Sequence, residues 1–329
     1  MTTLLLAWCS CASSWVIVRK DGSRIQCDNP FLITSGAYTF LDQNGEPHRV
    51  AVEEVDAEKT EAANSGVVTA GPDGASLGLY RAGASGAPTG DALVTFQPPY
   101  GTPPAASWSA LQVRPAEERF FVHVPRAYTG SEPFGLLVYS DGEHQTGLPD
   151  GWAAVLEQKR LLFVAAQGSE NSQNILRRLG LAALGAHQMK KLYNIDPARV
   201  YAAGFSGGAR VANELGFYNA SLFNGAIMNS GVEFYERVPR VRAKADTAGA
   251  PEGPGMVRLA PRRLDAVRRR MRFAIITGSR DFQRGSVLDV YYGGYVAHGF
   301  HAILFDVEGM GHETCGAPTL AQAIDFLDR

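Results

Sequence analysis

Cysteine is scarce in this chain, which holds four in 329 residues. So few cysteines exclude a small scaffold held together by disulfides. An excess of one charge is also missing, because 31 Lys and Arg residues nearly balance 33 Asp and Glu residues and leave a net charge of −2. Basic clusters interleaved with aromatic residues do not occur, which argues against nucleic acid as a partner.

Long hydrophobic runs and metal-binding spacings are missing as well. Apart from a short apolar run at the start, no stretch approaches the length of a membrane-spanning helix, so no transmembrane span is expected. The cysteines are solitary and no His-Glu-x-x-His motif occurs, so the pattern implies neither a metal nor another cofactor. Hydrophobic residues make up 45% of the chain, enough for the core of one large domain plus a smaller one.

Residues 199–212 carry the most informative pattern. A β-branched and aromatic run leads into Gly-Phe-Ser-Gly-Gly at residues 204–208, and a helix of small residues follows. Gly-x-Ser-x-Gly between a strand and a helix is typical of a nucleophile elbow, where glycines let strand and helix pack closely around a strained turn. The pentapeptide also arises by chance in glycine-rich chains, so its position decides the interpretation. Ser206 is therefore the candidate nucleophile.

A serine nucleophile needs a base and an acid that orients the base, in the order Ser, Asp or Glu, His. Residues 272–277 predict a buried strand that ends in a turn bearing Asp281. Residues 301–307 predict another strand, and the Gly-Met-Gly-His loop that follows presents His312. We therefore expect Asp281 and His312 to complete a triad with Ser206.

Other residues compete for the acid and the base. Asp289 falls in the predicted helix after Asp281, and Asp306 lies within a strand, so both fit less well than Asp281. His144 follows the end of a predicted strand at residues 134–139 and stays an alternative for the base. The remaining histidines lie in predicted helices or strands or in the N-terminal segment.

From about residue 108 to its end, the chain resembles α/β-hydrolases, nearest to secreted esterases of the polyhydroxyalkanoate-depolymerase and feruloyl-esterase kind. The matching residues are 194–208, the Thr-Gly-Ser-Arg-Asp turn at 277–281 and Gly-Met-Gly-His at 309–312. The resemblance implies an α/β-hydrolase fold, in agreement with the alternation of strands and long helices, which predicts a mostly parallel sheet covered on both faces. It also implies a serine esterase that cleaves small-molecule or polymeric carboxylic esters through an acyl-enzyme.

The resemblance further implies an oxyanion hole. One donor is the backbone N–H after the nucleophile, here Gly207, and the other comes from the loop after an early strand, which normally reads His-Gly. Here residues 140–144 read Ser-Asp-Gly-Glu-His. Backbone donors do not depend on side-chain identity, so the N–H of Asp141 or Gly142 is expected to serve. The acidic side chains of Asp141 and Glu143 beside a developing negative charge are unexpected.

Two alternatives to an esterase stay open. One is a serine peptidase of the same fold, although the N-terminal unit is too small for the propeller that usually restricts access in such enzymes. The other is a hydrolase-like binding protein of the cell envelope whose catalysis is impaired, which the acidic loop at residues 140–143 suggests.

Composition divides the chain into four parts. Residues 1–14 are a short apolar run ending in small residues and resemble the end of a secretory signal, which predicts a periplasmic or extracellular protein; the N-terminus of a cytosolic protein is the alternative. Residues 15–64 predict two β-hairpins and a short helix, a β-rich accessory module. Residues 65–107, rich in Gly, Pro, Ala and Ser, predict a linker with short strands at 77–80 and 93–96. Residues 108–329 are assigned to the catalytic domain.

Two cysteines, Cys27 and Cys315, lie beyond the signal-like segment. In an exported protein, a disulfide between them would tie the N-terminal module to the loop that carries His312. Two free thiols fit the pattern equally well.

Overall fold

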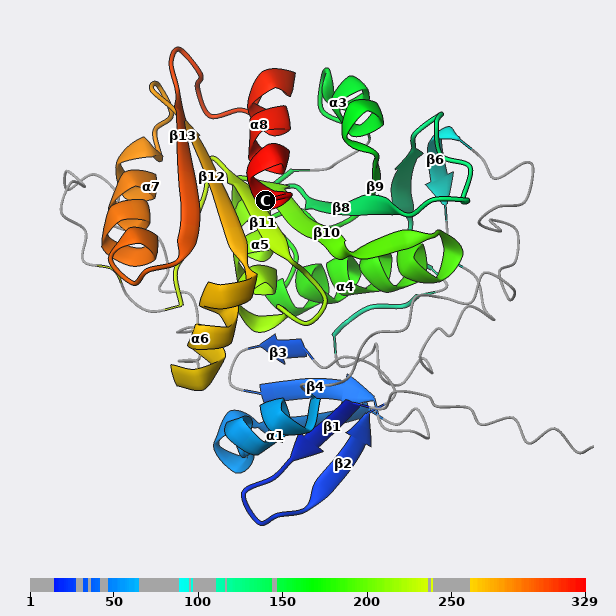
Figure 1. Cartoon of the computed structure of the whole chain (residues 1–329), viewed down its shortest axis with the longest axis vertical. Helices are drawn as coiled ribbons and strands as arrows, with labels where there is room; N and C mark the ends of the chain where they lie inside the picture. Colours follow the sequence, from blue (N-terminus) through cyan, green and yellow to red (C-terminus); the bar gives the residue numbers. More distant parts are fainter. Residues whose placement is uncertain are drawn as a thin grey trace, which may run out of the picture.

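The computed structural model of the chain has an eight-stranded sheet at its centre (Figure 1). The structure describes residues 15–27, 32–34, 37–41, 47–64, 89–94, 96, 111–115, 117–143, 147–235, 238 and 261–329. The signal-like segment at residues 1–14, the strand expected at 77–80, most of the predicted linker and His144 lie outside the described residues.

The central sheet is mostly parallel, as the alternation of strands and helices predicts. From one edge to the other its strands are β6 (Gly90–Val94), β7 (Phe120–Val124), β9 (Leu161–Ala166), β8 (Phe134–Ser140), β10 (Ile195–Phe205), β11 (Gly225–Asn229), β12 (Arg272–Gly278) and β13 (His301–Val307). The six strands from β9 to β13 in this order run parallel, and β7 is antiparallel to both of its neighbours. The carboxyl ends of the parallel strands therefore meet at one edge.

Helices cover both faces of this sheet (Figure 1). On one face lie α3 (Trp152–Lys159) and α8 (Ala317–Leu327); on the other lie α4 (Ile175–Leu192), α5 (Gly207–Tyr218) and α6 (Pro261–Arg270). Between β12 and β13 the chain forms α7 (Arg284–Val290) and a π-helix, η2 (Tyr291–Val296). In the described part of the chain, no helix is long and apolar enough to span a bilayer.

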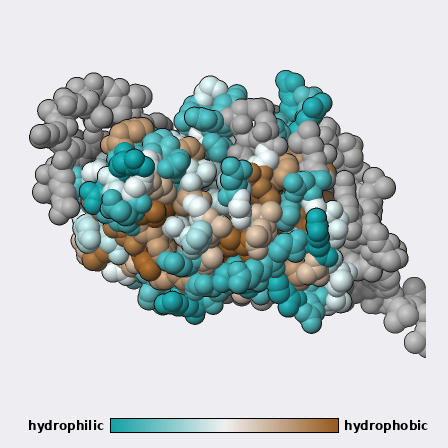
Figure 2. Space-filling view, turned by 90° about the horizontal axis from the view of Figure 1, so that it is seen from above, coloured by the Kyte–Doolittle hydropathy of each residue, from teal (hydrophilic) through white to brown (hydrophobic). Residues whose placement is uncertain are grey.

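Alternating side chains of the buried strands supply two separate cores. In β8, Leu136 and Val138 pack with α4 and α5, whereas Leu137 and Tyr139 pack with α3 and α8. Successive residues of a strand point to opposite faces, so a strand covered on both sides reads as a continuous apolar run. Seen from the side of α3 and α8, the outer surface mixes hydrophobic and hydrophilic residues (Figure 2).

The N-terminal module, residues 15–64, contains the two hairpins and the short helix that the sequence predicts. Its hairpins are β1 (Trp15–Val18) with β2 (Arg24–Cys27), and β4 (Ala37–Leu41) with β5 (Pro47–Ala51); β3 (Leu32–Thr34), η1 (Val52–Glu54) and α1 (Ala57–Asn64) complete it. Its buried residues Ile17, Tyr38 and Val50 belong to the same apolar cluster as the face of the sheet that α4 and α5 cover. In addition, β3 contacts α5 and α1 contacts α6. The N-terminal module therefore packs against the helices and the apolar core on this face of the central sheet.

The central sheet begins earlier in the chain than composition suggests. Within the range assigned to a linker, Gly90–Val94 forms β6 and pairs antiparallel with β7 along its whole length. The expected strand at 93–96 is thus displaced toward the N-terminus, and the central sheet includes residues before 108. The reason is tertiary: β6 is an edge strand that is specified by its partner β7, and its Gly-Asp-Ala-Leu-Val sequence has no strong local strand signal.

Cys315 is a free, buried thiol. The disulfide to Cys27, one of the two alternatives that the sequence left open, is therefore not formed. Burial raises the pKa of the Cys315 thiol to about 12, so it stays protonated and behaves as a small apolar side chain.

Candidate active site

Ser206 lies at the sharp turn between β10 and α5. Its backbone has φ 54° and ψ −118°, a conformation that costs a residue with a side chain about 1–3 kcal/mol. Its N–H donates to the carbonyl of Asn229 at the end of the neighbouring strand, with an N–O distance of 2.9 Å. The strand, strained turn and helix expected from the sequence are all present.

Two glycines of the pentapeptide make this turn possible. A Cβ atom on Gly204 would lie 2.2 Å from the carbonyl oxygen of Gly208, and one on Gly208 would lie 2.0 Å from the carbonyl oxygen of Ser140. Backbone occupies the space where a side chain would stand, so these positions accept only glycine without a shift of the chain.

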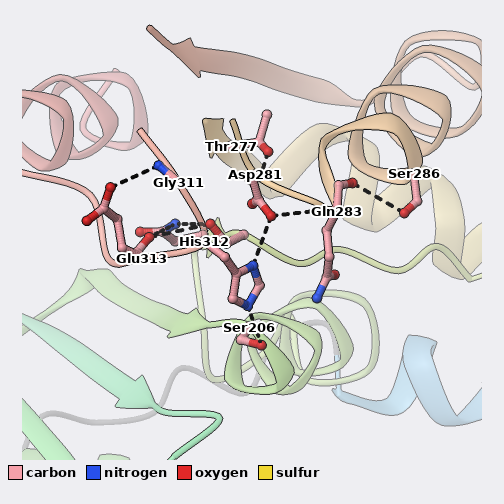
Figure 3. A network of polar contacts seen from close by, with 10 residues as sticks. Ser206, Thr277, Asp281, Gln283, Ser286, Gly311, His312 and Glu313 are labelled. Carbon is pink, nitrogen blue, oxygen red and sulfur yellow. Dashed lines mark hydrogen bonds and ion pairs between the residues drawn. The ribbon is translucent and has the colours of Figure 1, made fainter. Parts of the chain in front are cut away.

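Ser206, His312 and Asp281 meet at the carboxyl edge of the sheet (Figure 3). His312 Nε2 lies 3.0 Å from Ser206 Oγ, and His312 Nδ1 lies 2.9 Å from Asp281 Oδ1. With Nδ1 donating to the carboxylate, Nε2 of the neutral ring is left to accept the serine proton. The structure thus brings together the three residues singled out in the sequence.

The Asp281 carboxylate is held in place from two further sides. Its Oδ1 also accepts from the N–H of Gln283 at 2.9 Å, and its Oδ2 accepts from Thr277 Oγ1 at 3.3 Å. The Asp281 side chain is fully buried, whereas the His312 side chain is 20% exposed. A fixed carboxylate beneath a partly accessible imidazole orients the ring toward the serine.

The competing carboxylates lie elsewhere. Asp306 forms an ion pair with Arg284 at 2.6 Å. Asp289 is buried within α7. The preference for Asp281, based on its position directly after a strand, agrees with the hydrogen bond to His312.

The loop that carries His312 is fastened to the sheet by Asn229, which sequence reasoning missed. Asn229 Nδ2 donates to the carbonyl of Glu313 at 3.0 Å, and its Oδ1 accepts from the N–H of Cys315 at 2.5 Å. Before the histidine, Gly309 has φ 77° and its N–H donates to Ser279 Oγ at 2.8 Å. A polar residue ending the otherwise apolar strand β11 is the signal that would have pointed to Asn229.

The imidazole of His312 contacts two phenyl rings, a second feature that the sequence did not reveal. The ring centroids of Phe205 and Phe282 are 5.1 Å and 4.3 Å from that of His312. Phe205 is buried, but Phe282 is 76% exposed. The exposed phenyl ring of Phe282 provides apolar surface next to His312.

Of the residues expected to supply oxyanion donors, Gly142 lies beside Ser206. A Cβ atom on Gly142 would be 3.1 Å from Ser206 Cβ and 3.2 Å from Gly207 N. Gly207 is the first residue of α5, so its N–H has no acceptor within the helix. The backbone N atom of Asp141 lies near Gly208 instead, 2.9 Å from the position of a Cβ on that glycine.

The acidic side chain of Asp141 has a local structural task. Its Oδ2 accepts from Tyr139 Oη at 2.9 Å and its Oδ1 accepts from the N–H of Glu143 at 2.7 Å. Burial, reinforced by this carboxylate, raises the pKa of Tyr139 well above its usual value, so the phenol keeps its proton and donates. Both oxygens of Asp141 are therefore used to close the loop around Gly142.

Asn171, in the loop between β9 and α4, is a third residue near the elbow that the sequence did not reveal. Its backbone N–H donates to the carbonyl of Gly142 at 3.0 Å. Its Oδ1 occupies the space beside Gly207, 1.7 Å from where a Cβ would stand. The signal was present in the polar run at residues 168–174, which follows a buried strand at the same edge as the elbow.

In the described part of the chain, no group of three or more His, Cys, Asp or Glu side chains could hold a metal ion. The arrangement at the elbow consists of a hydroxyl, an imidazole and a carboxylate in series. Ser206 follows β10, Asp281 follows β12 and His312 follows β13, in the order that nucleophile, acid and base take along an α/β-hydrolase chain. The chain has the α/β-hydrolase fold.

No protein-family model matches this sequence, and no curated protein sequence matches it at a significant level. Among solved structures, the chain is similar to the S-formylglutathione hydrolase FrmB of Staphylococcus aureus, with 12% identity over 73% of this chain and 98% of that one and a TM-score of 0.48. It is similar to the poly(3-hydroxybutyrate) depolymerase LpqC of Bordetella parapertussis, with 16% identity over 64% and 81% of the two chains and a TM-score of 0.44. Because these sequence identities and TM-scores are low, the function must be argued from the site itself.

The elbow geometry generates a stability prediction. Gly208→Ala places a methyl group on the carbonyl of Ser140 and should lower the free energy of unfolding by about 1–3 kcal/mol or more. Gly285→Ala in α7 is the matched control, because no atom lies within 4 Å of its added Cβ. Thermal unfolding measures the stability of both variants, and equal melting temperatures would contradict the close approach of Gly208 to the carbonyl of Ser140.

A second prediction concerns Glu214 on α5. Burial, with a smaller contribution from Glu233, raises the pKa of Glu214 from 4.5 to about 8. The unfolded chain releases this proton near pH 4.5 and the folded protein releases it near pH 8, so the free energy of unfolding should fall as pH rises between these values. Glu214→Gln removes this pH-dependent contribution to the free energy of unfolding. The melting temperature of the variant minus that of the wild type should therefore increase from pH 4.5 to pH 8. Glu117→Gln on the surface is the control, and parallel pH profiles of wild type and Glu214→Gln would contradict the prediction.

Proposed function

We propose that this protein is a serine hydrolase that cleaves carboxylic esters. The observation that carries the proposal is the continuous series of hydrogen bonds from Ser206 Oγ through His312 to the buried Asp281 carboxylate, at a strained elbow. An isolated serine hydroxyl is a poor nucleophile at neutral pH. In such a series the histidine takes the serine proton during attack, which lowers the free-energy barrier.

In the acylation step, Ser206 Oγ attacks the carbonyl carbon of the ester while His312 Nε2 takes the hydroxyl proton. Asp281 accepts a hydrogen bond from the Nδ1–H of the resulting imidazolium and stabilises its charge, without itself taking the proton. The tetrahedral intermediate then expels the alcohol, which leaves with the proton from His312, and an acyl-enzyme remains. Water, deprotonated by His312, attacks the acyl-enzyme, and the carboxylic acid departs as Ser206 regains its proton.

We assign the backbone donors of the oxyanion hole to the Gly207 N–H and to the loop at residues 141–142. Within this loop, the position of Gly142 beside Ser206 and Gly207 favours the N–H of Gly142 over that of Asp141. Because Asp141 uses its carboxylate oxygens to bind Tyr139 and Glu143, the acidic loop is compatible with a developing negative charge at Gly142. The carboxylate of Asp141 therefore does not by itself favour an impaired, non-catalytic protein.

The proposed substrate is a small or polymeric ester with an apolar group near the scissile bond. Phe282 supports this choice, because its exposed ring lies directly against the ring of His312. Burying apolar surface of the substrate against such a ring contributes about 25 cal/mol per Å². The acyl chain or the alcohol of the ester is expected to contact Phe282.

The first functional prediction concerns the nucleophile. Wild type should hydrolyse acetyl, butyryl and hydroxycinnamoyl esters and react covalently with a fluorophosphonate probe. Ser206→Ala should remove the labelling and lower turnover by about a million-fold, with nearly unchanged thermal stability. Cleavage of peptides in preference to these esters would favour a peptidase. A folded wild type that neither reacts with the probe nor hydrolyses any ester would refute the proposal.

The second concerns the acid. Asp281→Asn should preserve the fold and lower kcat by about ten-thousand-fold, because the amide favours the wrong tautomer of His312. Asp306→Asn is the matched control, since Asp306 pairs with Arg284 away from the histidine. Steady-state kinetics on one ester compares the two, and a larger loss for Asp306→Asn would show that the acid is wrongly assigned.

A further inference from the structure

We infer that the side-chain amide of Asn171 donates a hydrogen bond to the oxyanion, and that buried Arg178 holds the amide in the orientation required. The inference rests on the proposed function, since an oxyanion forms only if Ser206 attacks a carbonyl. It adds a side-chain donor to the two backbone donors assigned above.

The position of the Asn171 amide nitrogen is the first observation. The point where a Cβ on Gly142 would stand is 3.1 Å from Asn171 Nδ2, 3.1 Å from Ser206 Cβ and 3.2 Å from Gly207 N. The amide nitrogen and the backbone nitrogen of Gly207 therefore border the same small space beside the nucleophile. An oxygen on a carbon bonded to Ser206 Oγ develops its charge in this neighbourhood.

The orientation of the amide follows from its contact with Arg178. A guanidinium only donates hydrogen bonds, so the amide atom that faces Arg178 Nη1 at 3.3 Å must be the oxygen Oδ1. The two amide atoms lie on opposite sides of the same carbon, so Nδ2 points away from Arg178. It donates to no group in the described part of the chain, and Asn171 is exposed to solvent. This donor is therefore free for a substrate.

Arg178 connects the two loops that flank the elbow. Its Nη2 donates to the carbonyl of Asp141 at 2.9 Å, and its Nε donates to the carbonyl of Ser169 at 2.6 Å. The residue is only 6% exposed. Burial lowers the pKa of its guanidinium, but arginine remains a cation in proteins. Arg178 is thus a positioning residue, and its charge lies behind the amide that contacts the oxyanion.

The chemistry of the amide suits the task. A neutral N–H donor held in place before the reaction stabilises the developing charge without reorganisation. Gly207 has to be glycine for this arrangement, since any side chain there would collide with Asn171 Oδ1. Gly142 leaves the space between Nδ2 and the serine open in the same way.

The test compares Asn171→Ala and Asn171→Asp with Ser172→Ala, an exposed neighbour in the same loop. Asn171→Ala removes the donor and should lower kcat by about 100- to 1,000-fold, with little change in KM. Asn171→Asp keeps an acceptor for Arg178 but replaces the donor by a negative charge, so its kcat should fall at least as far. Ser172→Ala should retain wild-type kinetics. Thermal unfolding should show all three variants folded.

A transition-state analogue provides an independent readout. The carbonyl of a trifluoromethyl ketone is attacked by Ser206 Oγ, and the adduct carries an oxyanion. A non-fluorinated amide ligand of the same shape is not attacked and resembles the substrate in its ground state. The affinity for the ketone should fall in Asn171→Ala by the same factor as kcat/KM, and the affinity for the amide should not change.

Two results would overturn the inference. Wild-type kcat in Asn171→Asp would mean that the side chain acts only through its bond to Arg178. A rise in KM at constant kcat in both Asn171 variants would mean that it binds the substrate in the ground state. Either result leaves the proposed esterase intact, provided that the wild type reacts with the fluorophosphonate probe. A wild type that neither reacts with the probe nor hydrolyses esters would overturn both proposals.

Discussion

The close crossing of backbone at the elbow is the constraint on which the site depends. The carbonyl of Gly208 lies where a side chain of Gly204 would stand, and the carbonyl of Ser140 lies where one of Gly208 would stand. These contacts press α5 onto the ends of β10 and β8, and they force Ser206 into a conformation with positive φ. The same approach brings the loop after β8 against the nucleophile. The position of Gly142, and with it the proposed oxyanion hole, is a consequence of this packing.

Around that crossing, hydrogen bonds between the ends of neighbouring strands hold the remaining parts of the site. Asn229 at the end of β11 binds the elbow through its carbonyl and the segment after His312 through its side chain. Arg178 binds the loops after β8 and β9. Both side chains are buried, and each donates to backbone carbonyls of other loops. Buried polar groups with satisfied partners specify one arrangement, because any alternative leaves a group unpaired.

The acidic loop at residues 140–143 shows how a local pattern can mislead. In the sequence, two carboxylates beside an expected oxyanion indicate repulsion. In the folded chain, the carboxylate of Asp141 accepts from a buried phenol and from a backbone N–H, and it shapes the loop. The phenol belongs to Tyr139, two residues earlier and within β8, but its burial depends on α3 and α8 packing over that face of the sheet. Only that packing shows why an acid stands at this position.

The elbow, the strands that precede Asp281 and His312, and the N-terminal hairpins could be predicted from the sequence, because they depend on glycines, turns and periodicities within a few residues of one another. The edge strand β6, the free thiol of Cys315 and the meeting of Asn171, Arg178 and Asn229 around Ser206 could not. These features arise from contacts between residues far apart in the chain. Such contacts form only when parallel strands bring their carboxyl ends to one edge, so the tertiary structure alone decided which polar side chains surround Ser206.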